Sequence, residues 1–209
     1  MSGDTIKWSL HGPIAVCGPD VHTIVKTILS SIRWKYAVGL TVHEKYDGME
    51  QMPAECMSDF VDEWSEINRS DERVAAPIII ICNPAQNEKW FQRLLLNGRH
   101  DNILVILTIV RIGVLPPWLR HQIRQFVFTP DTCMDNLVPE EVVKKFKLSL
   151  FSENNNVLVY SLLPGSPPSI TAVYINGPHE VVDYAVSNML PPSLLVFLFR
   201  KRRTIMLLE

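Results

Sequence analysis

The stretch PIIIICNPAQNEKWFQRLLLNGRHDNILVILTIV, residues 77–110, decides the fold class of this chain. It begins and ends with apolar runs, at 77–82 and 102–110, in which polar residues do not alternate with apolar ones. Such runs are typical of central parallel strands that are covered on both faces. Residues 86–96, between them, predict a helix. The stretch therefore predicts a strand, helix and parallel strand of an α/β sheet.

The same alternation continues in both directions along the chain. Further strands are predicted at 13–18, 36–42 and 125–129, and further helices at 20–32, 57–68, 118–124 and 139–150. Residues 157–163 and 170–175, separated by Pro and Gly residues, predict a β-hairpin, whereas 44–55 predicts a loop. We expect a single domain over residues 1–209, with its core at 13–130 and an extension at 131–209. The segment after Pro192 is ambiguous between strand and helix.

Composition excludes several classes of protein. With 20 Lys and Arg against 22 Asp and Glu, the net charge of −2 gives no whole-protein attraction to nucleic acid, so any DNA contact must use local basic clusters. No run approaches the roughly 18 apolar residues that span a membrane, and no secretory segment is visible, so we expect an intracellular protein. The cysteines at 17, 56, 82 and 133 lack CxxC spacing, which predicts buried reduced thiols rather than zinc ligands or disulfides.

Two motifs flank the predicted strand at 102–110: NGRH at 97–100 and LPPWLR at 115–120. In residues and separation they resemble the NGRH and LPPxxR segments of the genome-packaging ATPases of large double-stranded DNA viruses, a branch of the FtsK/HerA group of P-loop motors. The resemblance covers about residues 13–130. It implies a RecA-like P-loop NTPase fold with a mainly parallel sheet flanked by helices, and the hairpin extends it at the C-terminal side. It also implies ATP and Mg²⁺ as cofactors, duplex DNA and packaging proteins as partners, and assembly as a ring.

The phosphate-binding letters of that family are altered. A phosphate loop GxxxxGK[ST] needs glycines for its backbone, a Lys for the phosphates and a hydroxyl for Mg²⁺. Counted from Gly18, those three positions hold Thr23, Ile24 and Val25. Lys26 and Thr27 come two residues late, which rotates a helical side chain by roughly 200°. We therefore expect a vestigial phosphate loop comprising Gly18, Thr23, Lys26 and Thr27.

The positions that hold the family's catalytic acids are altered too. After the strand at 77–82 stand Cys82 and Asn83, where the family has acidic residues for Mg²⁺ and the attacking water. Val110 takes the place of the family's polar sensor. Gln122 and Arg124 replace the Asn and Asp that follow LPPxxR. With the phosphate loop, these departures imply that ATP hydrolysis is lost.

Arg99 is the remaining candidate for nucleotide chemistry. The resemblance implies a place near a subunit boundary, where Arg99 could contact a neighbour's nucleotide. The simpler interpretation is a loop arginine that caps helix carbonyls or pairs with Asp101. Gly98 is most simply a helix C-cap. The six histidines show no metal-binding spacing.

Basic residues form three clusters. Arg111, Arg120 and Arg124, with His121, are the candidates for contacts with DNA phosphates. Lys144, Lys145 and Lys147 favour a solvated helix face, and Arg200 to Arg203 fit either a polyanion-binding patch or a solubilising edge. Four tryptophans lie in apolar patterns that predict core or interface packing: Trp34, Trp64, Trp90 and Trp118.

Three functions remain open from the sequence. The leading hypothesis is a packaging-ATPase-like protein without ATP hydrolysis, a structural or accessory component of virion assembly or genome packaging, located in the virion or infected cell. The first alternative is an active packaging motor whose unconventional phosphate loop uses Lys26 or a neighbour's arginine. The second is a protein-interaction scaffold that does not bind DNA.

Overall fold

The computed structural model describes residues 6–10, 12–19, 21–34, 36–39, 46, 48–69, 77–84, 88–129, 156–162, 169–174 and 179–182. The predicted helix at 139–150, the segment after Pro192, the two C-terminal basic clusters and Cys133 lie outside these residues. Among the described residues, no helix is both long and apolar enough to span a membrane.

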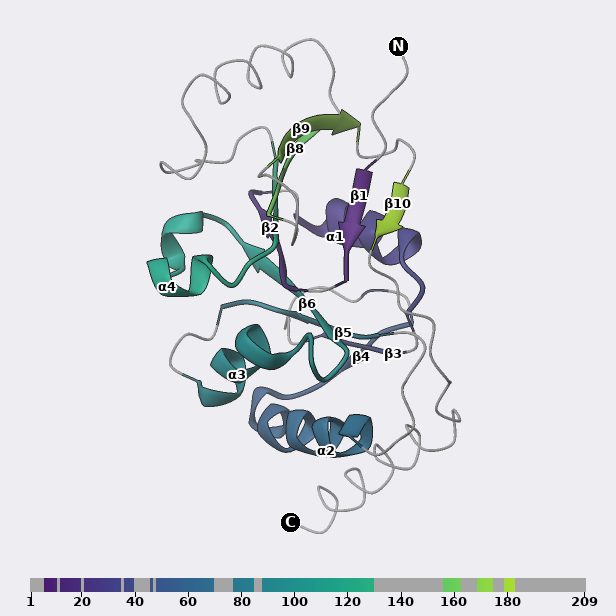
Figure 1. The fold of residues 1–209 in the computed structure, drawn as a ribbon, viewed down its shortest axis with the longest axis vertical. Helices are drawn as coiled ribbons and strands as arrows, with labels where there is room; N and C mark the ends of the chain where they lie inside the picture. The colour runs from purple at the N-terminus through teal and green to yellow at the C-terminus, as the bar shows by residue number, and fades with distance from the viewer. Residues whose placement is uncertain are drawn as a thin grey trace.

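An eight-stranded sheet in the order β4-β3-β5-β6-β2-β7-β8-β9 forms the centre of the molecule (Figure 1). Its strands are β2 (Ile14–Cys17), β3 (Tyr36–Gly39), β4 (Glu50–Gln51), β5 (Ile78–Cys82), β6 (Ile103–Ile109), β7 (Gln125–Phe128), β8 (Asn156–Ser161) and β9 (Ser169–Tyr174). Every pair from β4 to β7 is parallel, whereas β7-β8 and β8-β9 are antiparallel. The predicted hairpin is therefore confirmed, and it continues the main sheet.

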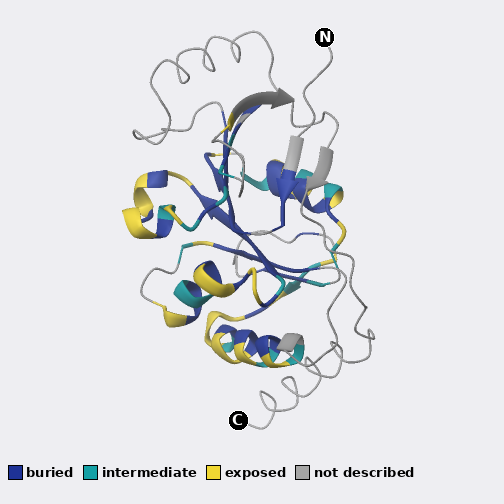
Figure 2. Ribbon diagram, in the orientation of Figure 1, coloured by how far each residue is buried: buried dark blue, intermediate teal, exposed yellow. Residues whose placement is uncertain are grey.

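The central strands are apolar without alternation because both faces of the sheet are covered (Figure 2). Residues such as Ile78, Ile80 and Val105 face one buried cluster, and their neighbours Ile79, Ile81 and Leu104 face the other. All residues of β2, β5, β6 and β7 are buried. The covering of both faces explains why helical and strand segments alternate along the chain.

Helices cover the two faces unequally. Helix α1 (Val21–Ser31) packs on one face through Ile24, Val25, Ile28 and Leu29. The other face carries α2 (Met57–Arg69), α3 (Lys89–Asn97) and the short α4 (Pro117–Arg120), with α3 drawn between α2 and α4 (Figure 1). Two 3₁₀ turns, η1 (Ala54–Cys56) and η2 (Ile112–Val114), precede α2 and α4.

The secondary structure differs from the sequence-based expectations in three places. Residues 44–55 were expected to form a loop, but they contain β4, which pairs with Val38 and Gly39 of β3, and η1 begins at Ala54. The helix expected at 118–124 ends at Arg120, since the Arg124 amide must donate to the Pro13 carbonyl at 2.9 Å as the chain enters β7. The sequence also gave no sign of β1 (Ile6–Ser9), which pairs in parallel with the distant β10 (His179–Val182).

Candidate nucleotide site

The connection from β2 to α1 occupies the place of a phosphate loop. Gly18 has a positive φ of 129°, which favours glycine, and its amide donates to the Ile109 carbonyl at 2.9 Å, at the end of neighbouring β6. Helix α1 begins at Val21, so few residues lie between strand and helix. A GxxxxG loop needs its backbone to turn around phosphate over that span, but here the same positions have become helix.

The side chains at the Lys and Ser/Thr positions belong to the core. Ile24 is 3% exposed and Val25 is fully buried, and both pack against the sheet residues Ile14 and Val16. Apolar side chains that are buried in this way offer neither a cation to phosphate nor a hydroxyl to Mg²⁺. The residues at the end of β2 therefore do not fit ATP with Mg²⁺.

The other residues of the expected vestigial loop lie on the outer side of α1. Thr23 and Lys26 are exposed, and Thr27 is half-buried. The Thr27 hydroxyl donates to the Thr23 carbonyl at 3.0 Å, a bond within the helix. Lys26 thus points away from the face that carries Ile24 and Val25, as its two-residue displacement predicts. The structure does not gather Gly18, Thr23, Lys26 and Thr27 into a phosphate cradle.

A neutral hydrogen bond replaces the acidic pair after β5. The Asn83 Oδ1 atom accepts a bond from the Thr108 hydroxyl of β6 at 2.7 Å. The residue before it, Cys82, is fully buried, and its thiol pKa is raised to about 12 by burial. Among the described residues, no group of three His, Cys, Asp or Glu side chains is placed to hold a metal ion. Cys82 and Asn83, the residues at the end of β5, therefore supply neither a carboxylate base nor a carboxylate ligand for Mg²⁺.

The NGRH segment is a tight turn between α3 and β6. Gly98 is the C-cap residue as predicted, but its φ of −51° is right-handed, and glycine is needed because a Cβ atom would lie 2.5 Å from the Leu94 carbonyl oxygen. The left-handed residue is instead Asn102, with a φ of 53°. Asn tolerates this conformation better than most residues. The chain can therefore reverse direction into β6 within a few residues.

Asp101 anchors that turn to α2, a role that the sequence analysis missed. Its side chain is 5% exposed, and the Oδ2 atom accepts a bond from the Ser65 hydroxyl at 2.7 Å. The Asp101 carbonyl accepts a second bond from the buried Trp64 Nε1 at 2.7 Å. From the sequence, Asp101 was considered only as a partner for Arg99. The position of Asp101 between a predicted turn and a predicted buried strand was the signal that could have indicated this anchoring role.

Arg99 matches neither of its simpler interpretations. It is exposed, and its Nε donates to His100 Nε2 at 3.2 Å rather than to Asp101 or to a helix carbonyl. A trans-acting role of Arg99 stays a prediction.

The LPPWLR motif builds a rigid surface turn. Pro116 precedes α4, Pro117 begins it, and Leu115 and Leu119 are buried beneath it. The half-buried Arg120 donates from Nε to the Leu115 carbonyl at 2.7 Å and so holds the turn together. Trp118 is 47% exposed, which overturns a core position within this chain, whereas Trp64 and Trp90 are buried and Trp34 is half-buried.

The three arginines proposed for DNA differ in their surroundings. Arg111 is exposed at the start of η2, Arg120 is tied to the turn, and Arg124 is half-buried beside Gly12, where a Cβ atom would meet its side chain. All three belong to the connection between β6 and β7. No described contact tests whether they bind DNA, so that function stays a prediction.

This sheet order and connectivity define the class: the chain has the α/β RecA-like P-loop NTPase fold, with β6 between β2, which enters the altered phosphate loop, and β5, which precedes Asn83. No protein-family profile and no curated protein sequence matches the chain.

Solved structures do match. The genome packaging NTPase B204 from Sulfolobus turreted icosahedral virus 2, in complex with sulfate, is similar with a TM-score of 0.51 and 11% identity, over 82% of this chain and 100% of that chain. Its complex with ATP-gammaS matches with a TM-score of 0.50 and 12% identity, over 77% and 97% of the two chains. EssC (ATPases 2 and 3) from Geobacillus thermodenitrificans has a TM-score of 0.49 and 13% identity, over 79% of this chain and 40% of that chain. At these identities the B204 similarities establish the fold, and no argument rests on EssC.

The buried thiols give a chemical prediction. Burial raises the pKa of Cys17 far above its ordinary value and that of Cys82 to about 12, whereas Cys56 is half-buried, which corrects its expected burial. Because the thiolate is the reactive species, iodoacetamide at about pH 8 should leave Cys17 and Cys82 unmodified in the folded protein. We expect peptide mapping by mass spectrometry to find both alkylated only after denaturation. Their modification under native conditions would contradict the structure.

Proposed function

We propose that this chain is a packaging-ATPase-like protein that has lost ATP hydrolysis and serves as a structural or accessory component of virion assembly or genome packaging. The fold similarity to B204 supports the class of protein, and the altered site supports the loss of hydrolysis. We expect the protein in the virion or the infected cell. Its proposed partners are other virion or packaging proteins, and duplex DNA if it takes part in packaging.

The burial of Ile24 and Val25 carries this proposal. These residues stand where a P-loop motor has its phosphate-binding lysine and its Mg²⁺-binding hydroxyl, and here they are 3% and 0% exposed in the core. The neutral bond between Asn83 and Thr108 is a second, independent difference from a P-loop motor. It lies after β5, two strands away from β2 in the sheet. Hydrolysis needs both halves of this machinery, so both losses favour a protein that does not turn over ATP.

The alternative of a working motor would require Lys26 to reach the phosphates. Lys26 is exposed on the outer side of α1, and a rebuilt loop would have to unwind the first turns of a helix that packs through Ile24, Val25 and Ile28. Removing those side chains from the core would cost about 1.5–3 kcal/mol for each one. The non-hydrolysing role is therefore the better proposal. We expect assembly as a ring mainly if the protein is a working motor.

A titration tests the proposal directly. We expect isothermal calorimetry to detect no binding of ATP-gammaS up to about 1 mM, with or without Mg²⁺, because no described group reaches the phosphates at the end of β2. B204, whose structure was determined with ATP-gammaS, is the positive control under identical conditions.

A hydrolysis assay with Mg²⁺ and duplex DNA completes the test. Turnover at motor-like rates that disappears in Lys26→Ala would reject the proposal and favour the active motor. Salt-dependent binding of duplex DNA without turnover would support an accessory role in packaging. Absence of any DNA binding at low salt would favour a scaffold that contacts only proteins.

A further inference from the structure

The large apolar side chains that are exposed lie on two segments, the connection from β6 to β7 and α3. Among the described residues, four large hydrophobic side chains are exposed: Val110 at 70%, Val114 at 48%, Trp118 at 47% and Leu96 at 47%. Three of them lie between β6 and β7, and Leu96 lies on α3, which covers the same face of the sheet as α4. Three exposed large apolar side chains within one connection indicate an interaction surface.

The surface around Trp118 is also basic. Residues 110–121, here called the basic segment, contain Arg111, Arg120 and His121, and no Asp or Glu occurs anywhere in residues 102–130. Arg111 and His121 are exposed. In a chain whose net charge is −2, such a stretch concentrates positive charge locally.

The opposite charge is found on α2. Its exposed residues Asp59, Asp62 and Glu66, together with Glu55 of η1, form what we call the acidic face. One of its carboxylates, on Asp62, is paired within the chain with Arg93 of α3. The acidic face therefore presents an excess of negative charge beside α3.

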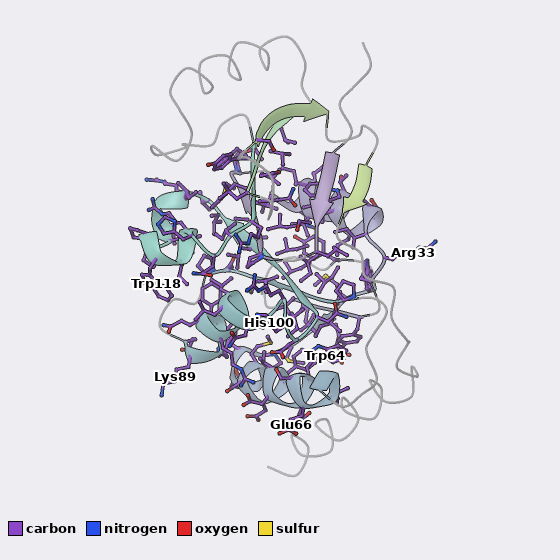
Figure 3. All side chains as sticks on the ribbon, in the orientation of Figure 1. Arg33, Trp64, Glu66, Lys89, His100 and Trp118 are labelled. Atoms are coloured by element: carbon purple, nitrogen blue, oxygen red, sulfur yellow. The ribbon has the colours of Figure 1, made fainter. Side chains whose placement is uncertain are left out.

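The basic segment and the acidic face flank α3 on the same side of the molecule. Helices α2, α3 and α4 all pack on one face of the sheet, with α3 drawn between the other two (Figure 1). Glu66 at one end and Trp118 at the other both extend away from the sheet (Figure 3). One side of the protein thus carries a negative end, an apolar side chain near its middle and a positive, partly apolar end.

We propose that this side binds a second copy of the chain in a twofold dimer. A twofold rotation about an axis near α3 would place each basic segment against the acidic face of the partner, so both charge contacts form at once in a self-complementary interface. Trp118 and Leu96 would lose their exposure to water in the same contact. Trp and Arg are the residue types that most often dominate binding at protein interfaces. The proposal rests on this surface and is independent of whether the protein binds ATP.

A second copy fits this surface better than DNA does. Arg120 already donates to the Leu115 carbonyl and Arg124 is half-buried, which leaves Arg111 as the exposed arginine of this connection. Affinity for DNA grows with the number of phosphates that are neutralised. A surface with so few exposed arginines would therefore bind DNA weakly. The exposed Val110 and Val114 would gain nothing from phosphate, whereas they suit a protein partner.

Sedimentation velocity of the purified full chain at about 1–100 µM tests the dimer. We expect a monomer–dimer equilibrium that weakens as salt is raised and that weakens about tenfold or more in Arg111→Glu and in Trp118→Ala. The matched control is Lys26→Glu, the same change of charge at an exposed site on α1, across the sheet, which should leave the equilibrium unchanged. Circular dichroism should show that each variant remains folded.

A charge swap makes the test specific. Asp59→Lys with Glu66→Lys should weaken the dimer, and combining these with Arg111→Glu should restore part of the lost affinity, because the charges at the interface are exchanged rather than removed. A monomer at every concentration would overturn the proposal, as would a ring of more than two copies. A dimer indifferent to Arg111→Glu and Trp118→Ala would also overturn it. A monomer that binds duplex DNA through Arg111 would assign the surface to DNA instead.

Discussion

Ile24→Lys, which restores the lysine of a phosphate loop at its family position, is expected to destabilise the protein by about 3–6 kcal/mol and to create no ATP binding. Ile24 is 3% exposed and packs with Ile14, Val16 and Ile28 in the cluster beneath α1. A lysine there loses the apolar contacts and must either discard its proton or pull its ammonium out through the helix packing. A loss of this size approaches the whole stability of many domains. Urea denaturation followed by circular dichroism measures it.

Thr23→Lys is the matched control for that experiment. Thr23 is adjacent in sequence but exposed, so the same side chain should cost less than about 1 kcal/mol there, mostly from a positive charge near a helix N-terminus. An Ile24→Lys variant that is as stable as Thr23→Lys, or that binds ATP-gammaS, would show that Ile24 faces a phosphate site and not the core.

Trp64→Ala is expected to destabilise the protein by about 3–5 kcal/mol. The Trp64 side chain is fully buried between α2 and the sheet, and its Nε1 donates to the Asp101 carbonyl at 2.7 Å. Removal leaves a large cavity and takes one of two side-chain bonds from the turn that leads into β6. Because this turn loses the Trp64 bond and keeps the one from Ser65 to Asp101, we expect it to be loosened and hydrogen exchange to increase first at residues 97–102.

Trp118→Ala provides the same substitution at a residue that is 47% exposed. Both variants should be compared in the Arg111→Glu background, in which we expect a weakened dimer, and at a protein concentration low enough that dimer formation does not contribute to the measured stability. The control should lose about 1 kcal/mol or less. Equal losses of stability in Trp64→Ala and Trp118→Ala would contradict the structure, in which Trp64 anchors the turn at Asp101 and Trp118 lies on the surface at α4.

The strands and the altered letters were predictable because they depend on local sequence. Unalternating runs such as Ile78–Cys82 predict strands covered on both faces, and the structure confirms this. The antiparallel hairpin was also found from its turn residues. The boundaries were less certain: α4 ends early because the Arg124 backbone must bond to Pro13, a contact that local periodicity does not contain.

The contacts that the sequence missed join distant segments. Strand β1 exists because β10 pairs with it, and the Ser9 amide donates to Gln125 Oε1 at 2.8 Å, so three parts of the chain must come together before either strand is defined. Asp101 likewise gains its role only when α2 brings Ser65 to it. Trp118 lies in a pattern that resembles those of the buried tryptophans, and only the turn fixed by Pro116 and Arg120 leaves it exposed.

By itself, the sequence determined the α/β class and showed which residues stand at the phosphate-loop and acidic positions of the family it resembles, because strand patterning and the identity of a side chain are both local properties. The tertiary structure decided what occupies their place. Helix α1 begins at Val21, so Ile24 and Val25 turn into the core, and the pairing of β5 with β6 brings Thr108 to Asn83. The tertiary structure also decided where the charged segments lie. The acidic face and the basic segment come to either side of α3 because α2, α3 and α4 pack on the same face of the sheet.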